Sequence, residues 1–235
     1  VTRACGIIGV MTHENKVSAE LYEGLLMLQH RGQDSAGMVT SDGSRFKEKK
    51  DNGLVKDVFD KRTMNYLDGN IGLGHVRYPT QGGLSATEAQ PFFVNSPLGI
   101  YLIHNGNLTN AFGLRKQLVE RGCIFQSTMD TEIIIHLIAI SLYSTVVDRI
   151  IDALKQVKGA YSLVAMTENS LIGVRDPMGV RPLVLGRFDN AYILCSETCA
   201  LDIIGADYVR DIDPGEPANM SILLAFESTH AAPQH

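Results

Sequence analysis

The chain has 235 residues, of which 45% are hydrophobic and 20% charged, so it can bury a full core and fold as one globular domain. Its formal net charge of −5 and its scattered aromatic residues argue against a surface that binds nucleic acid. Its most apolar stretch, residues 133–147, is interrupted by polar side chains and is too short to span a membrane, so we expect a cytoplasmic protein that binds no membrane.

The predicted elements alternate between strands and helices, without an internal repeat. Apolar runs predict a first strand over residues 6–11, then a helix that carries Leu21, Leu25 and Leu28 and ends at the polar segment 29–32. In chain order there follow strands at 37–40, 71–76, 92–95 and 100–104, helices at about 109–121, 130–142 and 146–157, strands at 162–167, 171–175, 183–185 and 191–196, and a short helix at 198–204.

Turn-forming residues separate two pairs of these strands. Asn-Ser-Pro-Leu-Gly occupies residues 95–99, and Thr-Glu-Asn-Ser occupies residues 167–170. Short connections of this kind join antiparallel neighbours. We therefore expect an α+β fold in which two mainly antiparallel sheets pack together and are covered by helices.

Cys5 stands just before the first predicted strand. If residues 1–4 were removed, this one residue would hold both a thiol nucleophile and, in its α-amino group, a base. A free α-amino group titrates at about 7.7 to 8.0, against about 10.4 for lysine, so it can accept the thiol proton at neutral pH. An amide nitrogen cannot do so. The alternative is that Cys5 is a small buried apolar residue.

The other cysteines show neither a disulfide framework nor the spacing of a metal site. Three residues separate Cys195 from Cys199, and the sequence has no second pair of metal ligands at a matching spacing. Cys123 is isolated in the sequence. Reduced thiols in the cytoplasm fit this pattern. Structural hydrogen bonds are expected for four of the histidines, His30, His75, His104 and His136.

Two polar segments follow the first helix and the third predicted strand. Residues 30–37 place five hydrogen-bonding side chains in a short loop, which is either solvated or part of a site. Arg77 ends the strand, and its planar guanidinium matches a carboxylate bidentately. The residues that follow, up to position 87, are rich in glycine and small polar side chains, as expected for a lid.

Two further polar segments precede predicted helices. In residues 104–110, the Asn105 amide and the backbone N–H of Gly106 either face a developing oxyanion or belong to a turn with a helix N-cap. Residues 127–132 are typical of a helix cap, and the helix dipole favours Asp130 in the first turn. A substrate ammonium group would bind the same carboxylate.

Seven motifs occur in an order that is specific to one family. The chain resembles the glutaminase domain of the amidophosphoribosyltransferases over about residues 5–216, through CGIIGV, HRGQDSAG, GHVRYPT, QPFFVNSPLGI, HNGNLTN, RDPMGVRPLVLG and DIDPGE. The resemblance implies a class II amidotransferase, an N-terminal nucleophile hydrolase with a four-layer αββα sandwich. Glucosamine-6-phosphate synthase is a rival, but its pattern has Tyr-Arg-Gly-Tyr-Asp at residues 30–34 and a tryptophan where this chain has Tyr78.

The resemblance also implies a role for each candidate site residue. Cys5 attacks the side-chain amide of glutamine and forms a γ-glutamyl thioester, which water hydrolyses after ammonia has left. The side chain of Asn105 and the backbone N–H of Gly106 form the oxyanion hole. Arg77 holds the α-carboxylate of glutamine, and Asp130 holds its α-ammonium group.

Two more residues enter through the same resemblance. Arg31 is expected to buttress the pocket, and Tyr78 lies near the hinge of the segment 77–87, whose closure over glutamine would exclude water. The resemblance divides the chain into a propeptide-like leader at 1–4, a glutaminase domain at 5–216 and an unassigned tail at 217–235.

Members of the resembled family continue into a phosphoribosyltransferase domain, for which these residues contain no counterpart. The ammonia would be used there to make phosphoribosylamine, the first step of purine biosynthesis. Mg²⁺ is expected only with that domain, and no cofactor is expected for this chain. The implied partners are glutamine, the phosphoribosyltransferase domain and further copies in a homo-oligomer. The alternative is a non-catalytic glutamine-binding or regulatory fragment in which Cys5 stays blocked.

Overall fold

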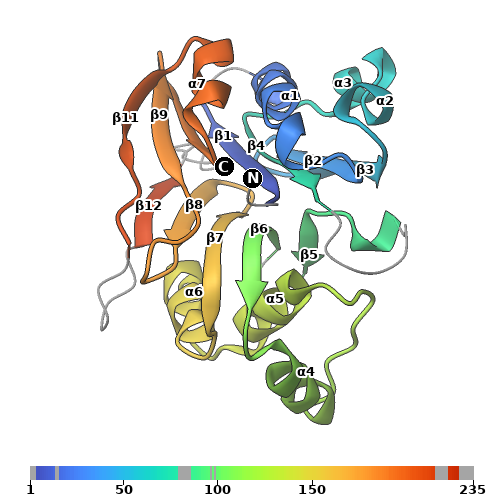
Figure 1. The fold of residues 1–235 in the computed structure, drawn as a ribbon, viewed down its shortest axis with the longest axis vertical. Helices are drawn as coiled ribbons and strands as arrows, with labels where there is room; N and C mark the ends of the chain where they lie inside the picture. Colours follow the sequence, from blue (N-terminus) through green and yellow to red (C-terminus); the bar gives the residue numbers. More distant parts are fainter. Residues whose placement is uncertain are drawn as a thin grey trace, which may run out of the picture.

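The computed structural model describes residues 4–13, 16–78, 86–95, 97, 99–214 and 222–227. Two β-sheets lie face to face in the middle of the molecule, and helices cover the outer face of each sheet (Figure 1). One outer layer contains α1 (Ser18–Met27), α2 (Val55–Val58), α3 (Lys61–Tyr66) and α7 (Thr198–Ile204). The other contains α4 (Ala111–Glu120), α5 (Asp130–Ile140) and α6 (Val146–Leu154). The expected αββα sandwich is confirmed.

Both sheets are antiparallel. The first has the strand order β11-β9-β10-β1-β4-β2-β3, and the second has the order β12-β8-β7-β6-β5. The strands are β1 (Gly6–Met11), β2 (Ser35–Ser41), β3 (Phe46–Asn52), β4 (Ile71–Arg77), β5 (Phe92–Val94), β6 (Ile100–Leu108), β7 (Gly159–Met166), β8 (Ser170–Arg175), β9 (Val184–Phe188), β10 (Ala191–Cys195), β11 (Asp207–Asp211) and β12 (Ile222–Glu227). The predicted turn segments 95–99 and 167–170 lie between the antiparallel pairs β5–β6 and β7–β8, and residues 96 and 98 of the first segment lie outside the described residues.

Three apolar clusters hold these layers together. One fills the space between the two sheets. The second lies between the first sheet and the helices α1 and α7, and the third lies between the second sheet and the helices α4, α5 and α6. Each sheet therefore buries both of its faces, which is why the central strands are apolar at nearly every position.

β1 is a central strand because it is apolar on both faces. Ile7 faces the second sheet and Ile8 faces α1, and neither is exposed. Gly9 also faces the second sheet, where an added Cβ would lie 2.8 Å from Cγ1 of Val164. The absence of a side chain at Gly9 lets the two sheets approach each other closely. Cys5, which precedes β1, is thereby placed at the end of the interface between the sheets.

All predicted helices and strands are present, with ends that differ by a few residues. Among the described α-helices and strands, five were not predicted: α2, α3, β3, β11 and β12. β3 has the sequence Phe-Lys-Glu-Lys-Lys-Asp-Asn, which has no apolar alternation, and yet it pairs with β2 along its whole length. Backbone pairing at the edge of the first sheet, rather than side-chain burial, defines this strand.

The end of β6 corrects one prediction. The sequence predicts a strand that stops at residue 104, but β6 continues to Leu108. Asn105 pairs with Ser162 on β7, and Gly106 pairs with Tyr161. The interpretation of residues 105–108 as a turn is therefore wrong, because β7 supplies partners for this backbone that the local sequence does not reveal.

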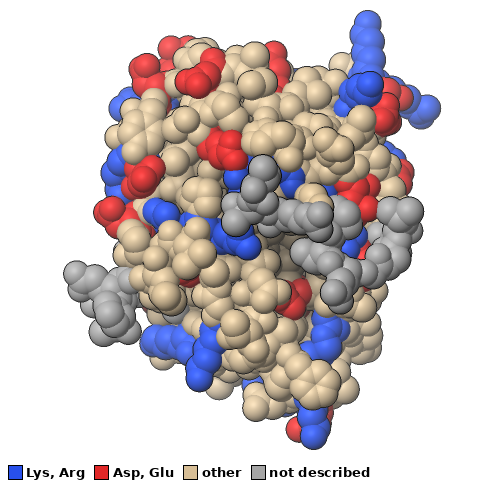
Figure 2. Space-filling view, in the orientation of Figure 1, with Lys and Arg blue, Asp and Glu red and all other residues tan. Residues whose placement is uncertain are grey.

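The remaining sequence-based expectations concern thiols, metals and membranes. All four cysteines carry free thiols. In the part of the chain that the structure describes, no helix is long and apolar enough to cross a bilayer, and no group of His, Cys, Asp and Glu is arranged to hold a metal ion. Figure 2 shows acidic and basic side chains interspersed over one face of the molecule.

Candidate active site

A small cavity opens where β1, β4 and β6 approach the first residue of α5. Its volume is about 120 Å³. It is lined by Cys5, Tyr78, Gln90, His104, Gly106, Asn107, Thr128, Met129 and Asp130. The structure thus brings together four predicted site residues that are far apart in the sequence. A wider groove of about 710 Å³ beside β3, β5 and α5 contains none of the predicted site residues, so volume alone does not locate the site.

Cys5 is partly buried, and its thiol is influenced by the positive charges of three arginines. Burial raises its pKa above the ordinary value, while a hydrogen bond from the backbone N–H of Tyr78 and the charges of Arg77, Arg31 and Arg181 lower it. The net direction is upward, so the thiol is protonated at neutral pH. A base must therefore remove this proton before Cys5 acts as a nucleophile.

Asn105 lies inside β6, on the strand that borders the cavity. Only 1% of the residue is exposed, and neither Oδ1 nor Nδ2 has a hydrogen-bond partner among the described residues. Such an orphaned amide costs free energy, and groups of this kind commonly bind a ligand. The predicted N-cap is instead Asn110, whose side chain bonds the backbone of Gln156 and Lys158. Asn105 is not part of a turn or a cap.

Gly106 lines the cavity next to Asn105. An added Cβ at this position would lie 2.2 Å from the carbonyl oxygen of Ala160 and 2.7 Å from Cα of Tyr161. Because both of these atoms belong to the backbone of β7, they cannot move aside without opening the sheet. The close contact between β6 and β7 therefore requires glycine at the position predicted to supply the backbone donor.

Asp130 is the first residue of α5 and also lines the cavity. Its Oδ2 accepts a hydrogen bond of 2.8 Å from the backbone N–H of Leu108, and it makes no bond that caps its own helix. Burial raises the pKa of the Asp130 carboxyl, although the bond from Leu108 and the charge of Arg115 lower it. The predicted side-chain cap of this helix is not observed, because the N-cap residue Met129 makes no such bond and Glu132 accepts instead from the backbone N–H groups of Gln126 and Ser127 in the preceding loop.

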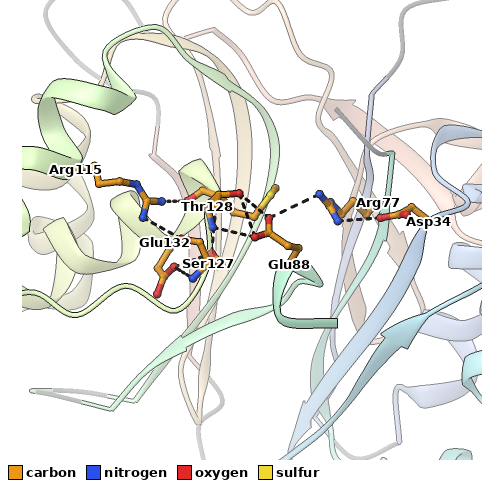
Figure 3. Close-up of polar contacts among 8 residues, drawn as sticks. Asp34, Arg77, Glu88, Arg115, Ser127, Thr128 and Glu132 are labelled. Atoms are coloured by element: carbon orange, nitrogen blue, oxygen red, sulfur yellow. Dashed lines mark hydrogen bonds and ion pairs between the residues drawn. The ribbon is translucent and has the colours of Figure 1, made fainter. Parts of the chain in front are cut away.

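Arg77 ends β4 and does not line the cavity. Its Nη1 lies 2.9 Å from Oδ2 of Asp34, and its Nη2 lies 3.8 Å from Oε2 of Glu88 (Figure 3). Its Nε has no hydrogen-bond partner among the described residues. The guanidinium is thus held between two carboxylates that the sequence did not identify as site residues.

Arg31 contacts the backbone of Cys5 directly. It ends the 3-10 helix η1 (Gln29–Arg31), and its Nε donates a hydrogen bond of 2.9 Å to the carbonyl oxygen of Cys5. Its Nη1 pairs with Glu197, which also accepts a hydrogen bond from His30. Arg31 thus holds the backbone of Cys5, and Glu197, which the sequence did not indicate, holds Arg31.

The buried histidines are hydrogen-bonded as expected. Nδ1 of His104 contacts the hydroxyl of Thr131 at 3.2 Å, and Nε2 of His75 contacts the carbonyl oxygen of His104 at 3.3 Å. Burial lowers the pKa of each of these two rings to about 3. Neither imidazole is therefore a strong base for the Cys5 proton.

Two predicted segments fall largely outside the described residues. The predicted lid depends mainly on residues 79–85, and the predicted leader depends mainly on residues 1–3.

Comparisons with known proteins identify relatives of this chain. A family described as a glutamine amidotransferase domain matches residues 75–202. The chain is 47% identical to amidophosphoribosyltransferases from Rhizobium etli and Escherichia coli, over 90% of its own length and 43% and 45% of theirs. It is also similar in structure to glutamine phosphoribosylpyrophosphate amidotransferase from B. subtilis, with a TM-score of 0.85 and 39% identity over 93% of this chain and 49% of the other. The chain spans about half the length of the relatives that it matches.

Proposed function

Since this chain belongs to the family of glutamine amidotransferase domains, we propose that it hydrolyses the side-chain amide of glutamine, with Cys5 as the nucleophile. The observation that carries the proposal is the cavity in which Cys5, Gly106 and Asp130 meet beside the amide of Asn105, which has no hydrogen-bond partner in the part of the chain that the structure describes. A nucleophile, an oxyanion donor and a buried carboxylate are the groups that hydrolysis of an amino-acid amide requires.

The chemical step proceeds through a thioester. The α-amino group of Cys5, once free, accepts the thiol proton, and the sulfur attacks the amide carbon of glutamine. Nδ2 of Asn105 and the backbone N–H of Gly106 stabilise the oxyanion that forms. The same amino group returns the proton to the departing nitrogen, so ammonia leaves. Water then adds to the thioester and releases glutamate and the thiol.

Asp130 and Arg77 bind the amino-acid end of glutamine, although only Asp130 lines the cavity itself. The Asp130 carboxylate faces the cavity and attracts the α-ammonium group. Arg77 offers the α-carboxylate its planar guanidinium, whose Nη1 also donates to Asp34. Tyr78, which follows Arg77 directly in the chain, also lines the cavity.

We further propose that the ammonia serves a phosphoribosyltransferase domain, as the names of the relatives suggest. The product would be phosphoribosylamine in purine biosynthesis, and any Mg²⁺ would belong to that domain. A cytoplasmic location and assembly into a homo-oligomer belong to the same proposal. Removal of residues 1–4 completes it, because only then does Cys5 carry a free amino group.

The test of the proposed function is release of glutamate from glutamine by the chain that begins at Cys5. We expect turnover by this chain and none by Cys5→Ala. Cys123→Ser serves as the control, because Cys123 packs beside the second sheet and is not part of the cavity. The proposal fails if the processed chain releases no glutamate, or if Cys5→Ala releases as much as the parent.

Asp130→Asn is expected to raise KM for glutamine about tenfold or more, because a charged hydrogen bond contributes about 1.5–3 kcal/mol. The asparagine oxygen still accepts from the N–H of Leu108, so the unfolding midpoint should change little. In the parent, KM should also rise as the pH falls through the raised pKa of Asp130, since the carboxyl group becomes neutral there. The variant should lack this dependence. An unchanged KM in the folded variant would remove Asp130 from the binding site.

Arg77→Lys is expected to raise KM for glutamine about tenfold or more, because lysine keeps the charge but loses the planar fork. It should also lower the unfolding midpoint, since Asp34 and Glu88 lose part of a buried partner. Arg45→Lys, an exposed substitution of the same kind, is the control for both measurements. A lower midpoint with a normal KM would show that Arg77 is structural only.

A further inference from the structure

Glu88 is a buried carboxylate close to the candidate active site. It ends the 3-10 helix η2 (Ala86–Glu88), which lies between β4 and β5 in the chain, and only 8% of the residue is exposed. It does not line the cavity that holds Cys5. A buried charge is stable only when it is paired and hydrogen-bonded, so the partners of Glu88 indicate what it does.

One partner of Glu88 is Arg77. The guanidinium lies between the carboxylates of Glu88 and Asp34 (Figure 3). Together these three groups carry one net negative charge. Because these side chains are buried, solvent and salt screen this excess only weakly. An anionic ligand that reaches Arg77 therefore meets an unfavourable field unless it brings a positive charge of its own.

The other partner of Glu88 is the loop that leads into α5. The backbone N–H of Thr128 donates to Oε1 at 3.0 Å, and the Thr128 hydroxyl lies 3.1 Å from each carboxylate oxygen. Thr128 stands two residues before Asp130. Arg77 belongs to the first sheet, and α5 packs on the second. Glu88 therefore links the two layers that would hold the α-carboxylate and the α-ammonium group of the substrate (Figure 3).

We propose that Glu88 is a positioning residue that makes the site selective for zwitterionic α-amino acids. The inference rests on the proposed function, in which Arg77 binds the α-carboxylate and Asp130 the α-ammonium group. Glu88 fixes the separation of these two groups. Its charge also disfavours a carboxylate that arrives at Arg77 without an ammonium group beside it. An amide of a simple carboxylic acid is thereby rejected, although its reacting bond is the same.

The experiment compares two amides with the chain that begins at Cys5. One is glutamine, and the other is 4-carbamoylbutanoate, which is glutamine without its α-amino group. The measured quantity is kcat/KM for glutamine divided by kcat/KM for 4-carbamoylbutanoate. Glu88→Gln keeps an acceptor for the N–H of Thr128 but removes the charge, and it should lower this ratio about tenfold or more, chiefly through KM.

Two variants serve as controls. Glu88→Asp retains the charge and should keep the ratio within about threefold of the parent value. Glu132→Gln removes a second buried carboxylate that binds the same loop, at the backbone of Gln126 and Ser127, but that binds no arginine among the described residues. It should lower the urea midpoint and leave the ratio unchanged. If the urea midpoint shows that Glu88→Gln does not fold, Glu88→Ala is the neutral variant to measure.

The outcomes separate this inference from the proposed function. If the parent hydrolyses glutamine and a folded neutral variant keeps the parent ratio, the inference is wrong and the proposed function stands. If the ratio falls as far in Glu132→Gln, the effect comes from packing of the loop, and the role of the Glu88 charge is rejected. If the parent does not hydrolyse glutamine, the proposed function is wrong, and this inference fails with it.

Discussion

A preparation that still carries residues 1–4 should hydrolyse glutamine about 10²- to 10⁴-fold more slowly than one that begins at Cys5, the contribution typical of a general base. In the longer chain, the nitrogen of Cys5 is part of an amide and cannot accept a proton. Burial raises the pKa of the Cys5 thiol, so few molecules hold a thiolate without help. The neighbouring imidazoles of His75 and His104 are too weakly basic to replace the amine.

The measurement is intact mass together with glutamate release, so that each rate belongs to a chain of known start. In the processed chain, kcat/KM should fall as the pH drops below about 7.7 to 8.0, the ordinary range of an α-amino group, because the protonated amine is no longer a base. Robust turnover by a preparation in which Val1 to Ala4 remain attached would identify another base and reject the role of the amine.

Asn105→Ala should lower kcat about 10²- to 10³-fold, the usual loss for one oxyanion donor, while the Kd for glutamine stays within a few fold. The amide acts on charge that develops only in the transition state, so the ground-state complex changes little. The unfolding midpoint should not fall, because the substitution removes two buried polar atoms that have no partner among the described residues. Binding is measured in the Cys5→Ala background, where glutamine is not consumed.

The matched control for this prediction is Asn110→Ala, in the same sequence motif. The side chain of Asn110 accepts from the N–H of Lys158 and donates to the carbonyl oxygen of Gln156. Its loss should therefore lower the unfolding midpoint by an amount equivalent to about 1 kcal/mol and leave kcat unchanged. If Asn105→Ala behaves like Asn110→Ala, Asn105 is structural and only backbone donors remain for the oxyanion.

The sequence predicted the elements whose pattern is carried by their own side chains. β1 is apolar at every position, and α7 was predicted with its observed ends. β3 was missed because its charged residues give no alternation, and its pairing with β2 is a property of the backbone. The end of β6 was misplaced for a related reason. Asn and Gly are typical turn residues, but pairing with β7 keeps them extended.

The site was predictable only where a motif pointed to it. Cys5, Gly106 and Asp130 do meet at one cavity. The carboxylates that hold the arginines were missed, because their partners are remote in the chain. Glu88 binds a loop 40 residues away, Asp34 meets Arg77 at a separation of 43 residues, and Glu197 meets Arg31 at 166. A single sequence carries no signal for contacts of this range, and periodicity describes only neighbours on one element.

The central position of β1 has a consequence for synthesis on the ribosome. β1 is made first among the described strands, yet one of its neighbours in the sheet is β10, and the N–H of Ile7 bonds the Ser196 hydroxyl 189 residues later. The carbonyl oxygen of Cys5 is held by Arg31, which in turn pairs with Glu197. The surroundings of the nucleophile are therefore complete only after residue 197 has left the exit tunnel. We expect this domain to acquire its native fold only after residue 197 has emerged, rather than progressively from its N-terminus.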